Sequence, residues 1–180
     1  MARGRRKVVD PTQETTMIDP SQTVPAAYSR LQKRLHWAVL LLVAAQFTVF
    51  HEIGRAFGHA MHGGRGTDGG TVALHALTGL TILGLMLWRL AIARRDGVPA
   101  LPEAEPDWAA RLARVTHAAF YAVLIAMPVL GGLALFAHIG PAAGLHKLLA
   151  GGLLGLIALH VTAVAVHQLA WKTNILGRMA

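Results

Sequence analysis

Any metal or redox chemistry in this chain must rest on histidine. The 180 residues include ten histidines and no cysteine, which excludes disulfides, thiolate-bound iron–sulfur clusters and cysteine nucleophiles. Two of the histidines, His146 and His160, lie fourteen residues apart in one long apolar stretch. On a helix that spacing corresponds to roughly 21 Å along the axis and an angular offset of only about 40°. The two imidazoles therefore share one helix face at two different heights.

The composition indicates an integral membrane protein. The chain is 54% hydrophobic and only 14% charged, which is more apolar than a single soluble core of this size requires. In a soluble protein the formal charge of +8 would suggest a nucleic-acid partner. Here the charges lie mostly between and outside the apolar runs, so we interpret them as topology signals and expect no nucleic acid to bind.

Four apolar stretches are long enough to cross a bilayer as helices. The first helix is predicted to begin at Ser29, which has capping-box spacing to Gln32, and to be fully apolar over Leu35–Phe50. The other three are predicted over Thr71–Ala93, Val115–Ala137 and Gly144–Trp171. We therefore predict an all-α fold, an integral membrane four-helix bundle formed by one domain over residues 28–178.

The segments outside these stretches are predicted to be irregular. Residues 1–27 look like a disordered basic tail, in which Met17 could be the true start instead of Met1. Residues 51–70 are predicted to form a polar, glycine-rich loop.

The distribution of positive charge predicts the orientation. Fourteen of the 17 lysines and arginines lie in the tail, the middle loop and the C-terminal segment, whereas the two opposite loops hold only Arg55, Arg65 and Lys147. Positive charge accumulates on the cytoplasmic side of membrane proteins. Both termini are therefore predicted to be cytoplasmic.

This topology pairs the histidines by depth. His75 and His146 each lie about one turn into a span that begins on the outer side, so they should lie at similar depth. His36 lies near the inner start of the first span, where either His160 or His167 could be its partner. Imidazoles inside a bilayer are costly and are usually functional.

Two imidazoles on facing helices can hold the iron of a non-covalently bound b-type haem. Four histidines that pair by depth therefore predict two haem b groups stacked across the membrane. A single histidine at a membrane edge is more often interfacial, and for His117 we favour that interpretation over binding to a haem propionate or a quinone oxygen. Another reading makes His51, His59, Met61 and His62 a copper or zinc site, but we favour a solvated loop.

Several short motifs, in this order, resemble the bacterial cytochrome b561 family. They are Tyr28–Gln32, Leu35–Trp37, Leu74–Gly79, Trp88–Leu90, His117–Tyr121, Met127–Pro128, Leu145–His146, Leu159–His160 and Trp171–Asn174. The resemblance implies a four-helix, multi-pass cytochrome of the bacterial inner membrane that carries two haem b groups and exchanges electrons with ubiquinone. It also implies haem ligands at His36, His75, His146 and His160, which favours His160 over His167.

The leading function hypothesis is a superoxide:ubiquinone oxidoreductase, in which superoxide or another periplasmic donor supplies electrons. The candidate quinone-binding residues at the inner side are His167, Trp171, Lys172 and Arg89, although an interfacial anchor explains Trp171 and Lys172 equally well. No residue is assigned a catalytic role. The alternative is a cytochrome b subunit of a larger dehydrogenase or hydrogenase, with a soluble partner subunit.

Overall fold

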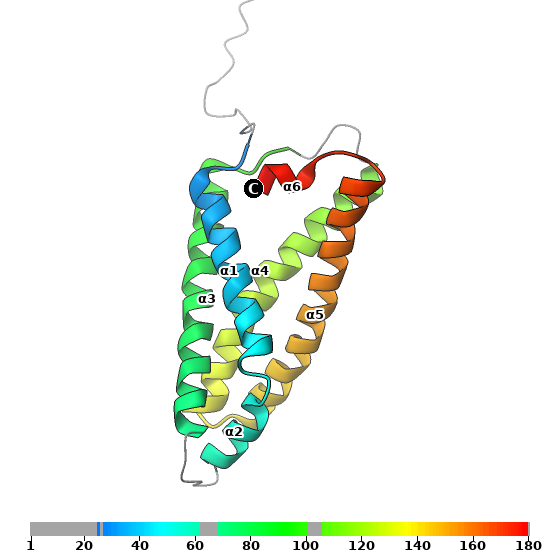
Figure 1. Ribbon diagram of the computed structural model, residues 1–180. Helices are drawn as coiled ribbons and strands as arrows, with labels where there is room; N and C mark the ends of the chain where they lie inside the picture. The colour runs from blue at the N-terminus through cyan, green and yellow to red at the C-terminus, as the bar shows by residue number, and fades with distance from the viewer. Residues whose placement is uncertain (1–24, 26, 62–67, 101–105, 180) are drawn as a thin grey trace, which may run out of the picture.

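The computed structural model describes residues 25, 27–61, 68–100 and 106–179, and this part of the chain is helical without any strand. Four long helices lie side by side, and two short ones lie at opposite ends (Figure 1). In chain order they are α1 (Arg30–Thr48), α2 (Ile53–Met61), α3 (Asp68–Asp96), α4 (Asp107–Phe136), α5 (Gly140–Leu169) and α6 (Ile175–Met179). The all-α bundle predicted from the sequence is confirmed. The tail predicted over residues 1–27 lies almost entirely outside the described residues.

The capping box predicted at the start of α1 is present and also joins α1 to α3. Ser29 Oγ accepts from the Gln32 amide at 3.2 Å, and the Gln32 side chain accepts from the Ser29 amide at 2.8 Å. The same Gln32 side chain donates to the carbonyl of Gly97, at the end of α3, and Arg89 of α3 donates to the Gln32 carbonyl. Gln32 thus both caps the start of α1 and links α1 to α3.

The prediction of an irregular loop over residues 51–70 is wrong for its first half, because Ile53–Met61 form α2. Ile53, Ala56 and Phe57 have the i, i+3, i+4 spacing of an apolar helix face, and Ala56 is 95% buried, with only 5% of its surface exposed. α2 packs against α3. Burial of this face outweighs the helix-weakening effect of the two glycines in the segment.

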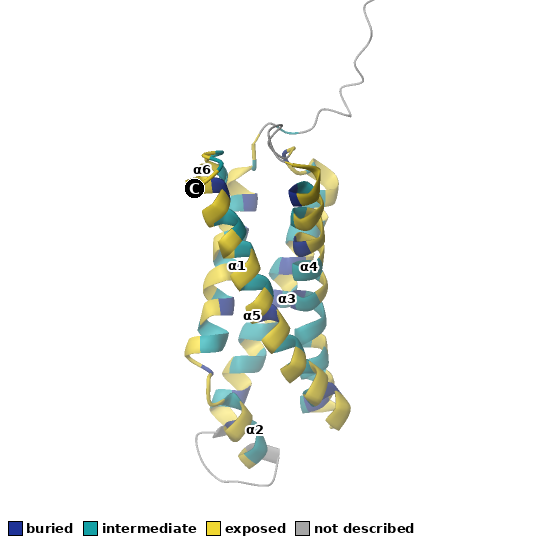
Figure 2. Cartoon of the chain, turned by 90° about the vertical axis from the view of Figure 1, so that its right-hand side faces the viewer, coloured by how far each residue is buried: buried dark blue, intermediate teal, exposed yellow. Residues whose placement is uncertain are grey.

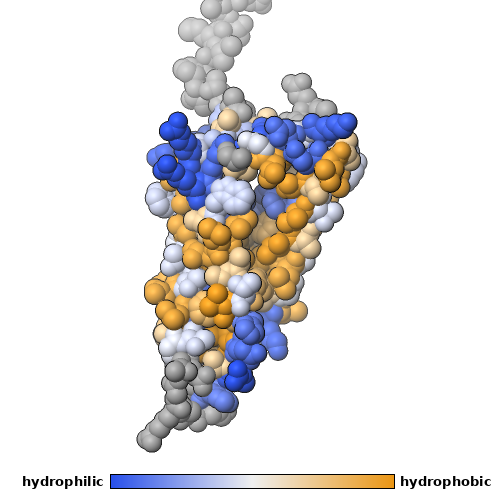
Figure 3. All heavy atoms as spheres, in the orientation of Figure 1, coloured by the Kyte–Doolittle hydropathy of each residue, from blue (hydrophilic) through white to orange (hydrophobic). Residues whose placement is uncertain are grey.

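The helices have the length and polarity of membrane spans. α3, α4 and α5 each qualify alone, and α1 qualifies together with α2 as a pair bent by 65°. Large apolar side chains point away from the bundle: Leu41, Phe136 and Leu148 are 66%, 78% and 71% exposed, and exposed surface dominates the outside of the helices (Figure 2). An apolar band separates two hydrophilic ends (Figure 3), as expected for a surface in contact with lipid.

The bundle is held by an apolar belt at mid-height. α1 packs on α3, α3 on α4 and α4 on α5, while α1 and α5 make little direct contact, and the surface is hollowed between them (Figure 3). One buried cluster joins the four long helices; its members are Val39, Val43, Ile82, Met86, Leu124 and Leu153. This belt divides the interior of the bundle into two halves.

The two ends of the bundle carry different short elements. α2 lies at one end, here called the α2 end, and α6 lies at the other, the α6 end, together with the start of α1 (Figure 1). α6 is tied down at two points: Met179 accepts from Trp37 Nε1 at 2.8 Å, and Arg178 donates to the Ala100 carbonyl at 2.8 Å. The beginning of the bundle domain and its C-terminal helix therefore lie at the same end.

Candidate functional site

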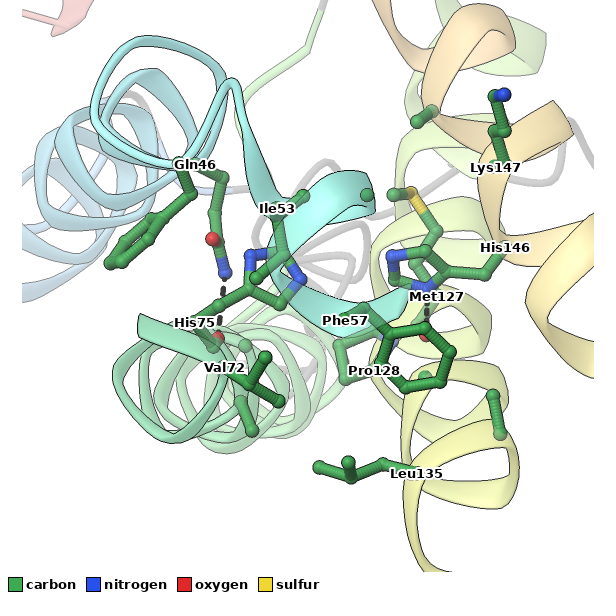
Figure 4. Close-up of a pocket in the computed structure, with 18 of the residues that line it drawn as sticks. Gln46, Ile53, Phe57, Val72, His75, Met127, Pro128, Leu135, His146 and Lys147 are labelled. Atoms are coloured by element: carbon green, nitrogen blue, oxygen red, sulfur yellow. Dashed lines mark hydrogen bonds between the residues drawn. The ribbon is translucent and has the colours of Figure 1, made fainter. Parts of the chain in front are cut away.

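A large pocket opens at the α2 end, between that end and the apolar belt. It has a volume of about 1210 Å³ and is lined by residues from α1 to α5, with Val43, Ile82, Leu124 and Leu153 of the belt at its floor. His75 of α3 and His146 of α5 both line it, and their rings point toward one another (Figure 4). Their ring centroids are 6.1 Å apart. The structure thus brings together the first pair of histidines predicted from the sequence.

The orientation of His146 is fixed by α4. His146 Nδ1 lies 2.8 Å from the Met127 carbonyl, and because a carbonyl only accepts, Nδ1 must carry the proton. The ring also lies against Gly131, where an added Cβ would be 3.3 Å from Nδ1 and Cε1. The absence of a side chain at Gly131 therefore lets the imidazole approach α4, and the tautomer leaves Nε2 as the nitrogen with a lone pair.

The surroundings of His75 are different. Its ring packs edge-on against Phe50, with centroids 5.6 Å apart. Its Nδ1 is buried without a hydrogen-bond partner. The nearest polar side chain that the structure connects to this residue is Gln46 of α1, whose Nε2 donates to the His75 backbone carbonyl at 3.2 Å, while Gln46 Oε1 is itself buried and unpartnered.

These features fit a metal held between two imidazoles. Metal–imidazole bonds are about 2 Å long, so a metal between two rings requires ring centres roughly 6 Å apart, and the observed separation is 6.1 Å. A metal-bound histidine also normally donates its other ring nitrogen to a carbonyl or carboxylate, as His146 does. The pocket is at least as large as the roughly 300–1,000 Å³ typical of small-molecule sites, so a porphyrin between His75 and His146 fits this part of the bundle.

Polar and charged groups from the α1–α2 turn, α2 and α5 also line this pocket. His51, Glu52, Arg55 and Lys147 all line it, and Arg55 Nε pairs with Glu52 at 3.0 Å. Across the described residues no three histidine, aspartate or glutamate side chains converge as metal ligands. The side chain of Met61, one of the residues of the copper or zinc reading, is not among those described. His62 and Arg65 lie outside the described residues.

A second polar group lies on the other side of the belt, in the α6-end half of the bundle. We call it the α6-end cluster, and each long helix contributes one member: His36, Arg89, His117 and His160. The His160 ring contacts His117, with centroids 5.6 Å apart, whereas no ring contact joins it to His36. His36 nevertheless interacts electrostatically with the other three members. The predicted partners His36 and His160 are thus in one cluster, with His117 beside them.

The turn that follows α5 holds a third group of polar residues. His167 is only 7% exposed, its Nδ1 lies 3.0 Å from Thr173 Oγ1, and its ring contacts Trp171 with centroids 4.6 Å apart. Trp108 of α4 packs edge-on against Trp171 at 6.1 Å. Lys172 has a left-handed φ of 53°, which a residue with a side chain adopts only when its surroundings hold it there.

The four residues predicted to hold a quinone therefore fall into two groups. His167, Trp171 and Lys172 belong to the α5 turn, whereas Arg89 interacts with His36 and His117 of the α6-end cluster. Arg89 and Arg178 also interact with Tyr28, just before α1. The pKa of the Tyr28 phenol is raised, because the effect of burial is larger than the lowering effect of these two positive charges.

Sequence reasoning missed Gln46 and underrated His117. Gln46 is a polar residue within an otherwise apolar span, and that alone is a signal of function in a membrane helix. For His117 the sequence favours an interfacial position over a binding role, whereas in the structure its ring contacts that of His160 inside the bundle. Trp108 and Thr173 carried no local signal, because their role depends on the fold of the α5 turn.

Comparison with known proteins gives matches along most of the chain. The family model described as prokaryotic cytochrome b561 matches residues 27–180. A cytochrome b562 of Cereibacter sphaeroides is 30% identical over 157 residues, covering 87% of this chain and 97% of that protein. A protein of Yersinia pestis described as "Probable superoxide oxidase CybB" is 30% identical over 173 residues, covering 84% and 94%. Cytochrome b561 homolog 1 of Escherichia coli is 26% identical over 178 residues, covering 84% and 96%.

Proposed function

The chain belongs to the prokaryotic cytochrome b561 family, and on that basis we propose that it is a two-haem membrane cytochrome that carries electrons across the bilayer to ubiquinone. It is a multi-pass protein of the bacterial inner membrane, and its family implies haem b. When bound, haem b supplies a centre that gains and loses one electron. Two such centres, one on each side of the apolar belt, would give a path through the membrane.

The observation that carries this proposal is the meeting of His75 and His146 in a large pocket whose floor is the belt. Their ring separation of 6.1 Å is close to that required for one metal ion held between two imidazoles, so these two residues would hold the haem iron. We assign the second centre to His36 and His160, which share the α6-end cluster. Arg89 in that cluster would supply positive charge to an acidic group of the bound porphyrin.

We propose superoxide as the electron donor at the α2 end, which the charge distribution along the sequence places in the periplasm. Arg55 and Lys147, which line the pocket, would attract a small anion and raise its encounter rate. Two superoxide anions each lose one electron and become two molecules of oxygen. One ubiquinone takes up both electrons and two protons and becomes ubiquinol.

We propose that ubiquinone binds near the α5 turn, at the cytoplasmic side. His167 and Trp171 are in ring contact there, and His167 follows His160 by two helical turns on the same face. His167 could deliver a proton to a quinone oxygen, and Lys172 could stabilise the negative oxygen that develops on reduction. Trp171 would form a wall of the site.

The test is a dithionite-reduced minus oxidised spectrum with haem quantitation, followed by stopped-flow mixing with superoxide and then with ubiquinone. We expect two low-spin b haems per chain, fast reduction by superoxide and reoxidation by ubiquinone. One haem per chain would contradict the two-centre proposal. Two haems that superoxide does not reduce, with a co-purifying iron–sulfur or catalytic subunit, would favour the role of cytochrome subunit in a larger dehydrogenase or hydrogenase.

A further inference from the structure

We infer that Gln46 of α1 is a positioning residue for His75, with its side-chain oxygen accepting the Nδ1 proton of that imidazole. The inference rests on the proposed function, because it assumes that His75 ligates a haem iron through Nε2. It adds a specific role for a residue of α1, a helix that contributes no ligand to this pocket.

The two histidines of the pocket differ in the hydrogen bonding of Nδ1. His146 has its Nδ1 on the Met127 carbonyl at 2.8 Å, which is the arrangement that fixes the tautomer and strengthens the ligand. His75 Nδ1 is buried and has no acceptor. A buried imidazole N–H without a partner is costly, so an acceptor for it is to be expected close by.

Gln46 provides the one acceptor that is buried and unpartnered beside it. Gln46 Oε1 and His75 Nδ1 are the two buried side-chain polar atoms without a partner across the described residues. They belong to residues that are already joined, since Gln46 Nε2 donates to the His75 carbonyl. Figure 4 shows the Gln46 amide next to the His75 ring. Pairing of these two atoms requires the Gln46 amide to rotate from its present bond to the His75 carbonyl.

Gly79 marks the position of the Gln46 amide. It follows His75 by one turn of α3, and a Cβ built on it would be 3.6 Å from Gln46 Nε2. The amide therefore lies along the face of α3 that His75 and Gly79 share. A glutamine here is costly in a membrane helix unless its polar groups are used.

A hydrogen bond from Nδ1 makes the imidazole a stronger electron donor to the iron. Gln46→Leu should therefore raise the midpoint potential of the haem held by His75 and His146. Gln46→Glu, with a stronger acceptor, should lower it. Opposite shifts from two substitutions at one position are not expected from a purely structural role.

The experiment is a redox titration of the purified, haem-loaded protein, with the haem of this pocket identified beforehand from the His75→Ala variant. Haem release to a scavenger protein is measured in parallel. We expect Gln46→Leu to release this haem roughly ten- to hundredfold faster, as for other losses of a ligand's hydrogen-bond partner, with the second haem unchanged. Thr48→Val is the matched control, since the Thr48 hydroxyl donates within α1, to the Ala44 carbonyl, and is exposed.

Unchanged potentials and release rates in both Gln46 variants would overturn the inference and leave the proposed function intact. Loss of the haem in both variants would also overturn it, because Gln46 would then act through packing. A wild-type protein without haem would contradict the proposed function itself.

Discussion

The two histidine sites are built in different ways. His75 and His146 meet across the α2-end pocket, with ring centroids 6.1 Å apart, whereas the His160 ring contacts His117 and not His36. α4 packs on both α3 and α5 and therefore braces the first pair. His36 and His160 belong to α1 and α5, which make little direct contact.

The difference indicates which site is pre-organised by the protein. In the α2-end pocket, the carbonyl of Met127 and the open space at Gly131 fix the ring of His146, a proposed ligand, before any cofactor binds. In the α6-end cluster, a group held between α1 and α5 would itself join the two helices. We therefore expect the second site to contribute more to bundle stability when loaded, and the first to depend more on its local hydrogen bonds.

Substitution of the histidines is expected to have the largest effect and tests the difference between the two sites. His75→Ala and His146→Ala should each remove the haem of the α2-end pocket and leave one haem per chain. His36→Ala and His160→Ala should remove the other haem and also lower the thermal unfolding temperature further, because the α1–α5 seam loses its bridge. Haem quantitation and thermal unfolding of the purified variants measure both effects.

His117→Ala is the control for this set, since it removes a histidine of the same cluster that is not assigned as a ligand. It should retain two haems. If it loses the same haem as His160→Ala while His36→Ala does not, then His117 is the partner of His160.

Reporter fusions test which site faces which compartment. A periplasm-active reporter fused after Met179 should be inactive, and one inserted near Glu52 should be active, because positive charge collects at the α6 end. The converse pattern would place the α2-end pocket at the cytoplasm and would exclude periplasmic superoxide as its donor.

Substitutions in the α5 turn test where ubiquinone binds. His167→Ala and Lys172→Ala should keep both haems and their reduction by superoxide, but slow reoxidation by ubiquinone tenfold or more, which corresponds to about 1.4 kcal/mol of barrier. Stopped-flow absorbance measures both steps. Equal reoxidation rates in the wild type and both variants would move the site elsewhere, with His117 and Arg34 as the next candidates.

A smaller effect is expected from a single methyl group beside His146. Gly131→Ala would place a Cβ 3.3 Å from the ring, so the ring must shift and its hydrogen bond to Met127 must weaken. We expect about threefold faster release of that haem, less than for complete loss of such a bond. Gly132→Ala is the matched control, because its Cβ would meet only Phe136, at 4.0 Å; equal release from the two variants would contradict the role of Gly131.

The sequence by itself determined the four long helices and the positions of the histidines along them. Apolar length predicts membrane spans, and the rise per residue converts sequence position into depth. The capping box at Ser29 was equally readable, because all its atoms lie within four residues. These properties are local, so they do not depend on how the helices pack.

Only the tertiary structure decided how each helix is rotated and which side chains meet. Gln46 and His75 are 29 residues apart, and His117 and His160 belong to different helices. α2 is a helix because α3 covers its apolar face. The chain after α5 turns through left-handed backbone at Lys172 and Asn174. The depth of a side chain in the membrane follows from counting residues along its helix. The rotation of a helix about its axis and the path of a turn depend on packing between distant segments, and an apolar sequence alone does not specify that packing.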